Sequence, residues 1–235
     1  LLARQAVALD DLSGGRMILG VGAGWNEQEH VMYGYTLGDV PTRMARFEEG
    51  LEIITRLIHN AEPASYTGRF FRLQDAVLRL PRPTAPPILI GGSGPKRTLP
   101  LVARFADIWN GQNLTPDEFR ERSAQLDQLL HDAARQPGDV KRTYTTPVVC
   151  GSTSAELEQR LRPWRESIAE WADLPLTDLL DNIRNYFKGI VGPPEAIVEQ
   201  IKAYGMAGVE KFICMWGYGD SEGLQLLAEQ VLPHL

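Results

Sequence analysis

Five short hydrophobic runs, each suited to a buried strand, alternate along the chain with segments whose apolar residues recur at helical spacing. The runs are Met17–Val21, Pro87–Ile90, Asp107–Trp109, Tyr144–Cys150 and Lys211–Trp216. Continuous apolar runs of this length are typical of parallel strands that are covered on both faces. The alternation of strand and helix therefore predicts an α/β fold.

The helical segments carry recognisable start and stop signals. The first, residues 1–12, ends at Gly14 and Gly15, and glycine tolerates the left-handed conformation that closes many helices. Thr115 and Thr153 are each followed three residues later by glutamate, which is the spacing of a capping box. Further helices are predicted over residues 40–58, 194–204 and 224–232, with an extra helical excursion over 164–188.

The number of strands predicts part of a TIM-type (β/α)8 barrel. A closed barrel of this class has eight parallel strands and about 250 residues, whereas these 235 residues supply five strands. We expect one barrel domain over residues 1–235 that carries about the last five β/α units and lacks about three N-terminal units. Its first and last strands are then expected to expose unpaired edges and apolar faces.

Residues 60–86 interrupt the strand and helix rhythm with a proline-rich stretch. Such a stretch is too long for an ordinary connection, and long loops in compact domains are often lids or binding loops. It predicts an insertion over the barrel mouth, although a passive excursion that covers a helix is the alternative.

Composition narrows the class of partner. The net charge of −6 and the isoelectric point near 5.3 argue against a surface dedicated to nucleic acid or to anionic membranes. No apolar run approaches the roughly 18–20 residues that span a bilayer, so we expect a cytoplasmic protein. Cys150 and Cys214 are expected to be reduced and to lie in the barrel interior. The four histidines show no metal-binding spacing, so no protein-bound metal is expected.

The strongest candidate for binding chemistry is the glycine-rich turn after the second strand. Three glycines and Ser93 stand between Ile90 and Thr98, where the chain enters a helix. Backbone N–H groups at the start of a helix can hold an anion, which makes Gly92, Ser93 and Gly94 a candidate phosphate cradle. A tight turn that needs glycine for steric reasons is an equally good explanation at this point.

A second glycine-rich turn follows the first strand and contains Gly22, Ala23, Gly24 and Trp25. Its spacing is a poor match to the dinucleotide fingerprint GxGxxG. The small residues would instead let a flat aromatic cofactor lie against the backbone with Trp25 beside it, although packing in the core is the simpler role for a lone tryptophan.

Other strand ends offer weaker candidates. Trp109 and Asn110 end the third strand and could contact a ring or a substrate, or could pack against the next loop. Acid and base candidates are limited to Glu27, Glu29 and His30, which an exposed helix start would equally explain. No general base is assigned from the sequence.

Several motifs, taken in order, closely resemble the bacterial luciferase-like monooxygenase family over essentially the whole chain. They are Leu12–Arg16, Leu19–Trp25, Pro87–Gly94, Ala106–Asn110 and the C-terminal stretch from Val191 to Val209. The resemblance implies a TIM-like barrel that binds coenzyme F420 or FMN at its C-terminal mouth. It implies that Gly92, Ser93 and Gly94 hold the cofactor phosphate, and that Gly22, Ala23, Gly24 and Trp25 border the ring.

Within that family the sequence looks most like the F420-dependent branch, with FMN as the alternative cofactor. The resemblance implies hydride transfer to or from a small organic substrate, or oxygen insertion with FMN, and a homodimer when full length. Trp25 stands where the F420-dependent sugar-phosphate dehydrogenases carry a proton-donating glutamate, which argues against a sugar-phosphate substrate. The family's first three strands often supply a catalytic histidine, so the catalytic residues stay unknown.

Two further classes of function remain open. A non-catalytic flavin-binding barrel would bind the cofactor without turnover, which agrees with the sparse acid and base groups. A phosphate-binding isomerase or aldolase would need a lysine or glutamate at a strand end, and no strand end in this chain offers a lysine.

Overall fold

The computed structural model of the chain describes residues 1–59, 62–79, 84–167, 171, 173–217 and 219–235. These residues form two compact units. The first combines Leu1–Trp109 with Gln128–Val140, and the second combines Asn110–Asp127 with Lys141–Leu235. Each unit is mixed α/β with parallel strands, as the alternation of runs predicts.

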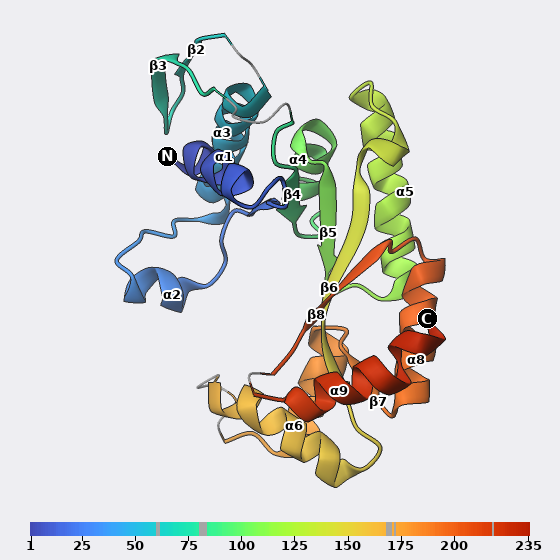
Figure 1. Cartoon of the computed structure of the whole chain (residues 1–235). Helices are drawn as coiled ribbons and strands as arrows, with labels where there is room; N and C mark the ends of the chain where they lie inside the picture. The colour runs from blue at the N-terminus through green and yellow to red at the C-terminus, as the bar shows by residue number, and fades with distance from the viewer. Residues whose placement is uncertain (60–61, 80–83, 168–170, 172, 218) are drawn as a thin grey trace. The chain divides into compact units, whose positions relative to one another are not determined.

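The first unit holds the two glycine-rich turns. Its elements are α1 (Leu2–Leu12), β1 (Leu19–Val21), α2 (Glu27–Met32), α3 (Val40–His59), β2 (Ala64–Thr67), β3 (Arg72–Ala76), β4 (Ile88–Gly91) and α4 (Thr98–Phe105) (Figure 1). Strand β1 pairs in parallel with β4, with Leu19 opposite Ile88. The next strand, β5 (Ile108–Gln112), begins beside β4, because Asp107 and Ile88 exchange two hydrogen bonds of 2.9 and 2.8 Å.

The core of this unit lies around β4. Ile88 and Ile90 are fully buried, and so are Leu99 and Val102 of α4 and Leu51 of α3. Ile88 and Ile90 are alternate residues and therefore lie on one face of β4, which is the face buried in this core. The core therefore fixes the end of β4 and the start of α4, which is where the turn between them lies.

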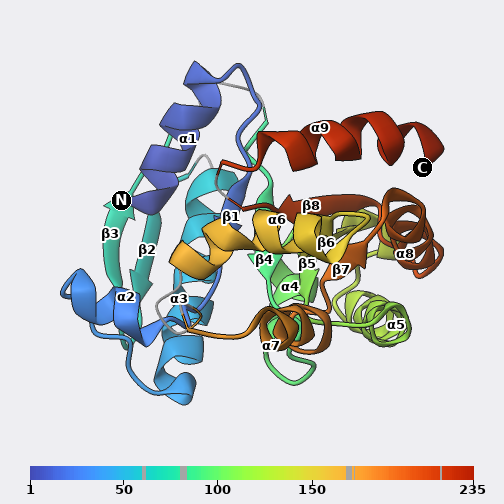
Figure 2. The same ribbon diagram turned by 90° about the horizontal axis from the view of Figure 1, so that it is seen from below.

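A two-stranded hairpin, β2 with β3, occupies much of the predicted insertion and lies beside α3 (Figures 1 and 2). The carboxylate of Glu49 on α3 accepts hydrogen bonds from the backbone N–H groups of Arg69, Phe70 and Phe71 at 2.8, 2.9 and 3.3 Å. One acidic side chain thus anchors the hairpin turn to the helix. Residues 60–61 and 80–83 of the predicted insertion lie outside the described residues.

Replacing Glu49 by glutamine is expected to loosen the hairpin. Desolvation raises the pKa of Glu49, but its hydrogen bonds from the three backbone N–H groups and the nearby Arg69 charge together hold that pKa below its usual value. The carboxylate therefore stabilises the anchored hairpin at neutral pH, and this stabilisation is lost as the pH falls through the lowered pKa of the folded protein. We expect faster hydrogen exchange of residues 64–76 in E49Q at pH 7, and a difference from the wild type that disappears in acid.

The matched control is Glu62→Gln, which removes the same charge from an exposed position next to the hairpin. Exchange in E62Q should equal that of the wild type at every pH. Equal exchange rates in E49Q and the wild type at pH 7 would contradict the anchoring role of Glu49.

The second unit contains the C-terminal strands. Its elements are the end of β5, most of α5 (Pro116–Asp132), β6 (Lys141–Cys150), α6 (Ser154–Ser167), α7 (Leu176–Asp181), a π-helical turn (Asn182–Tyr186), β7 (Ile190–Gly192), α8 (Pro194–Met206), β8 (Lys211–Met215) and α9 (Ser221–Gln230). Strand β6 pairs in parallel with β8 along residues 143–147 and with β7 along residues 148–150. Strand β7 is a correction to the sequence analysis, which placed no strand there.

Buried aromatic rings hold this unit together. The ring of Tyr144 on β6 stacks on that of Tyr204 on α8, with 4.6 Å between ring centroids. Both hydroxyl groups donate to the carbonyl oxygen of Leu114, at 2.6 and 2.9 Å. Burial raises the pKa of Tyr144 and of Tyr204, so both phenols stay neutral at physiological pH. Their role is to connect β6, α8 and the loop after β5.

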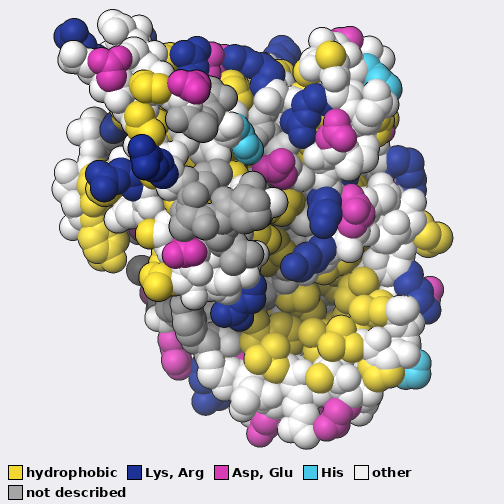
Figure 3. Space-filling model, turned by 45° about the horizontal axis from the view of Figure 1, so that its top comes forward, with side chains coloured by type: hydrophobic (Ala, Val, Ile, Leu, Met, Phe, Trp, Pro, Cys, Tyr) yellow, Lys and Arg dark blue, Asp and Glu magenta, His cyan; other side chains and the backbone are white. Residues whose placement is uncertain are grey.

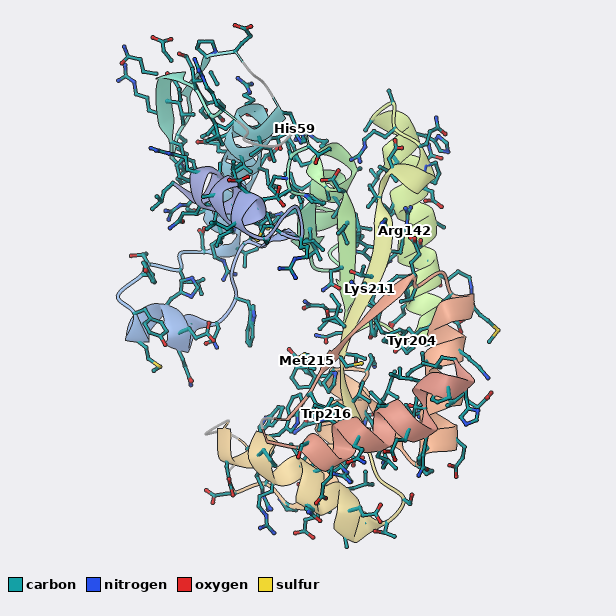
Figure 4. All side chains as sticks on the ribbon, viewed as in Figure 1. His59, Arg142, Tyr204, Lys211, Met215 and Trp216 are labelled. Carbon is teal, nitrogen blue, oxygen red and sulfur yellow. The ribbon has the colours of Figure 1, made fainter. Side chains whose placement is uncertain are left out.

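The two cysteines differ in environment. Cys150 is buried at the end of β6, and burial raises the pKa of its thiol to about 11. Cys214, which the sequence analysis places in the interior, is exposed on β8. The reason is that β8 pairs only with β6 among the described residues, which leaves most of its side chains accessible. Figure 4 shows Lys211 and Met215 of this strand and Trp216 just beyond it.

Candidate functional site

The turn between β4 and α4 consists of Gly92–Arg97 and begins at a conformation that only glycine adopts readily. Gly92 has a φ of +120°, far outside the regions open to residues with a side chain. The carbonyl oxygen of Gly94 accepts from the backbone N–H groups of Thr98 and Leu99, both at 3.1 Å, at the first turn of α4. The turn therefore leads directly into the positive end of a helix.

The same turn packs closely on the first residue of α4. A Cβ atom on Gly92 would lie 3.3 Å from Cγ2 of Thr98, and one on Gly94 would lie 3.1 Å from its hydroxyl oxygen. Both distances are shorter than ordinary carbon contacts. The two explanations for these glycines, a steric requirement and an anion-binding turn, are compatible. Both rest on a backbone that carries no side chains at Gly92 and Gly94.

Trp109, predicted to contact a ring or substrate, lies fully buried on β5. Its indole Nε1–H donates to the carbonyl oxygen of Gly92 at 2.8 Å. The structure thus brings together two predicted site residues that are 17 positions apart in the sequence. The sequence analysis did not anticipate this hydrogen bond, although a buried indole N–H is a signal that a nearby acceptor must exist.

Asn110 lies in the second unit and is also buried, with 5% of its surface exposed. Its amide oxygen accepts from the hydroxyl groups of Thr143 at 2.9 Å and Thr145 at 3.1 Å, and its Nδ2 lies 2.9 Å from the Thr145 hydroxyl. These bonds connect β5 to β6. In this structure the side-chain amide of Asn110 therefore links two strands of the sheet. Its contact with substrate stays a prediction.

The turn after β1 is open. A Cβ atom on Gly22 would meet no atom within 4 Å, and Gly24 has a φ of +77°. The side chain of Trp25 is 82% exposed, so packing in the core, the simpler alternative at the sequence level, is wrong. An exposed indole beside two glycines gives a flat surface on which an aromatic ring can stack.

The acid and base candidates lie just after this turn, on the short helix α2. Asn26 caps the helix by accepting from the N–H of Glu29 at 3.2 Å, and Nδ1 of His30 donates to the Asn26 carbonyl at 2.7 Å. Glu27 and Glu29 are exposed in the first helical turn. This is the arrangement of an ordinary helix start, and nothing in it assigns a catalytic base.

Two other features are absent from the residues that the structure describes. No three histidine, cysteine or acidic side chains among them gather closely enough to hold a metal ion. Within the same residues, no helix combines the length and the apolar character needed to cross a membrane. On the face drawn in Figure 3, basic side chains are interspersed with acidic ones.

Comparison with known proteins identifies the family. A sequence model of the luciferase-like monooxygenases matches residues 1–211. The chain belongs to the luciferase-like monooxygenase family. The resemblance inferred from the motifs is therefore confirmed, and the matched region of this luciferase-like chain includes both glycine-rich turns and Trp109.

Relatives of this luciferase-like chain use more than one cofactor. An uncharacterized protein of Mycobacterium tuberculosis is 28% identical over 216 residues, which cover 91% of this chain and 65% of the relative. An FMNH2-dependent dimethylsulfone monooxygenase of Pseudomonas fluorescens is 23% identical over 99% of this chain and 69% of its own length. The chain thus spans 65% of the length of the first of these relatives.

A solved structure with the same fold is an F420-dependent secondary alcohol dehydrogenase in complex with an F420–acetone adduct. It matches with a TM-score of 0.81 and 18% sequence identity, over 99% of this chain and 74% of that chain. At this identity the likeness establishes the fold of the luciferase-like chain.

Proposed function

We propose that this protein is an oxidoreductase that uses coenzyme F420 for hydride transfer to or from a small organic substrate. The observation that carries the proposal is the turn between β4 and α4, within a chain of the luciferase-like family. The fold we propose for the full-length protein is the (β/α)8 barrel, of which this chain carries about the last five units, with residues 60–86 as an insertion over the mouth.

The residues of this turn fit a phosphate group. Gly92, Ser93 and Gly94 offer backbone N–H groups without bulky side chains, at the positive end of α4. Lys96 and Arg97 follow directly and are exposed, which adds positive charge at the same place. We assign the cofactor phosphate to this turn.

The turn after β1 suits the ring of the cofactor. We assign the ring to Gly22, Ala23, Gly24 and Trp25: the space beside Gly22 is open, and the exposed indole of Trp25 can stack on a ring, while the His30 ring lies close to Gly24. A bound deazaflavin or flavin supplies the hydride chemistry, and the residues of the chain bind and orient it. Trp109 and Asn110 remain candidates for the substrate pocket, and the catalytic residues are not assigned.

FMN is the second candidate, which the FMNH2-dependent relative of Pseudomonas fluorescens favours. With FMN the reaction class would be oxygen insertion by a monooxygenase. The phosphate assignment is the same for both cofactors, because each carries a phosphate on the ribityl chain. In either case we propose a homodimer when full length.

The test is to titrate the natural full-length protein with F420 and with FMN in parallel and to measure binding by fluorescence quenching. Tight binding of F420 alone supports the proposed function and justifies a substrate screen that follows the absorbance of the reduced cofactor. Preference for FMN would move the assignment to a flavin monooxygenase. Binding without turnover of any screened substrate would favour the non-catalytic alternative, and binding of neither would refute the phosphate assignment.

A further inference from the structure

The indole of Trp109 donates a hydrogen bond to the glycine turn from another element. It reaches the turn from β5, with Nε1 at 2.8 Å from the carbonyl oxygen of Gly92. The ring is fully buried, so its position is fixed by packing on the surrounding core. A rigid donor therefore holds one carbonyl of the turn.

Planarity of the peptide unit extends this effect to the next residue. In a trans peptide the C=O of one residue and the N–H of the next point in opposite directions within one plane. The chain contains no cis peptide among the described residues. Since the C=O of Gly92 points toward the indole of Trp109, the N–H of Ser93 points away from it. The hydrogen bond thus sets the direction of a candidate phosphate-binding N–H group.

Glycine makes such control necessary. Gly92 has no Cβ, so its ψ is less restricted than that of other residues, and the peptide that follows it changes orientation more easily. Thr98 limits the space for a side chain at position 92, since an added Cβ would lie 3.3 Å from its Cγ2. Without the indole donor, the turn would exchange between orientations of this peptide.

We infer that Trp109 is a positioning residue that orients the Gly92–Ser93 peptide for the phosphate of the cofactor. The inference rests on the proposed function, because it concerns the same turn. It replaces the role first predicted for Trp109, a contact with substrate, by one that acts through the backbone. Its consequence is specific: loss of the indole N–H should weaken binding of the phosphate and leave binding of the ring unchanged.

The experiment compares Trp109→Phe with wild type in the natural full-length protein. The ligand pair that differs only in the phosphate is FMN and riboflavin. F420 and its deazariboflavin, which differ in the phosphate and in the tail attached to it, are titrated in parallel. We expect W109F to lose about two- to tenfold in affinity for the phosphorylated member of the pair, the factor that matches one neutral hydrogen bond. Affinity for the phosphate-free member should stay within about twofold.

Trp216→Phe is the matched control. Trp216 also donates its indole N–H to a backbone carbonyl at 2.8 Å, that of Asp220, so this variant loses a bond of the same kind and length. W216F should keep the wild-type ratio of the two affinities. If W109F does not fold, a benzothienylalanine at position 109 keeps the shape of the ring and replaces its N–H by sulfur.

Three results would be decisive. The deciding quantity is the affinity for the phosphorylated ligand divided by the affinity for the phosphate-free ligand. If this ratio falls in the position-109 variant and is unchanged in W216F, the positioning role is supported. An unchanged ratio in the position-109 variant, or equal weakening of both ligands, overturns it. A wild-type protein that shows no preference for either phosphorylated ligand would instead refute the proposed function itself.

Discussion

Gly92→Ala is expected to weaken binding of the phosphorylated cofactor by about tenfold or more. An alanine at a φ of +120° is strained, and a residue held in such a region costs roughly 1–3 kcal/mol. Its Cβ would also lie 3.3 Å from Cγ2 of Thr98. In the free variant the turn should relax to an unstrained conformation. Binding of the cofactor must then restore the strained conformation, and about 1.4 kcal/mol of strain lowers the affinity tenfold. Titration with FMN and F420 measures the loss.

Gly138→Ala is the control for this prediction. A Cβ on Gly138 would meet no atom within 4 Å, and its φ is not positive. G138A should bind both cofactors as the wild type does. The double variant G92A/T98S removes the methyl group that the new Cβ approaches, so recovery of affinity would assign the loss to crowding, and continued loss would assign it to backbone strain. If G92A bound the cofactors with the affinity of the wild type, the assignment of the cofactor phosphate to this turn would be contradicted.

Asp220→Ala is expected to produce the largest loss of stability in the second unit. Asp220 and Arg160 form an ion pair with 2.5 Å between carboxylate oxygen and Nη1, and their side chains are only 9% and 10% exposed. Removal of one partner from a buried pair typically costs about 3–5 kcal/mol, because the remaining charge stays buried without compensation. Denaturant unfolding of the full-length protein should show this loss as a lower midpoint.

Two further variants separate the causes. The carboxylate of Asp220 also accepts from the N–H of Gly223 at 2.9 Å as the cap of α9, and Asp220→Asn keeps an oxygen for that bond while it removes the charge. D220N should therefore be more stable than D220A. Lys202→Ala removes a pair with Glu199 that is 3.9 Å long and largely exposed, and should cost under about 1 kcal/mol. Equal stability of D220A and K202A would contradict the role of the buried pair.

The strands that the sequence predicts well are those with continuous apolar runs. Predicted runs overlap β1, β4, β5, β6 and β8. Continuous apolar runs are typical of strands that are covered on both faces, and β5 and β6 are mostly buried, whereas most residues of β8 are exposed in this structure. Strand β7 has three residues between Gly189 and Pro193, which is too short a run to distinguish from a loop. Its place is set by pairing with Val148–Cys150, a contact that the local sequence does not encode.

The hairpin within residues 60–86 escaped prediction for a different reason. Its strands contain many polar residues, and exposed residues alternate with half-buried ones in much of their length. They therefore form no hydrophobic run from which a strand could be predicted. The turn between them is held by Glu49, about 20 residues earlier in the chain. Glu49 lies on α3, and only the folded chain reveals that the hairpin turn bonds to it.

At the candidate site, the sequence predicted where the turns lie but not how they are held. Glycine spacing located Gly92 and Gly94, because a sharp strand-to-helix turn restricts which residues can stand there. The bond from Trp109 depends on β5 starting beside β4, which is a property of the topology. Trp25 is exposed, whereas packing in the core is the simpler expectation for a lone tryptophan.

A crystal structure of the natural full-length protein with whichever cofactor it binds, F420 or FMN, tests the assignment of the phosphate most directly. We predict that the cofactor phosphate lies within hydrogen-bond distance, about 2.7–3.2 Å, of the backbone nitrogen atoms of Ser93 and Gly94. The indole of Trp109 should still donate to the carbonyl of Gly92 in that complex. A phosphate bound away from the turn between β4 and α4 would contradict the account.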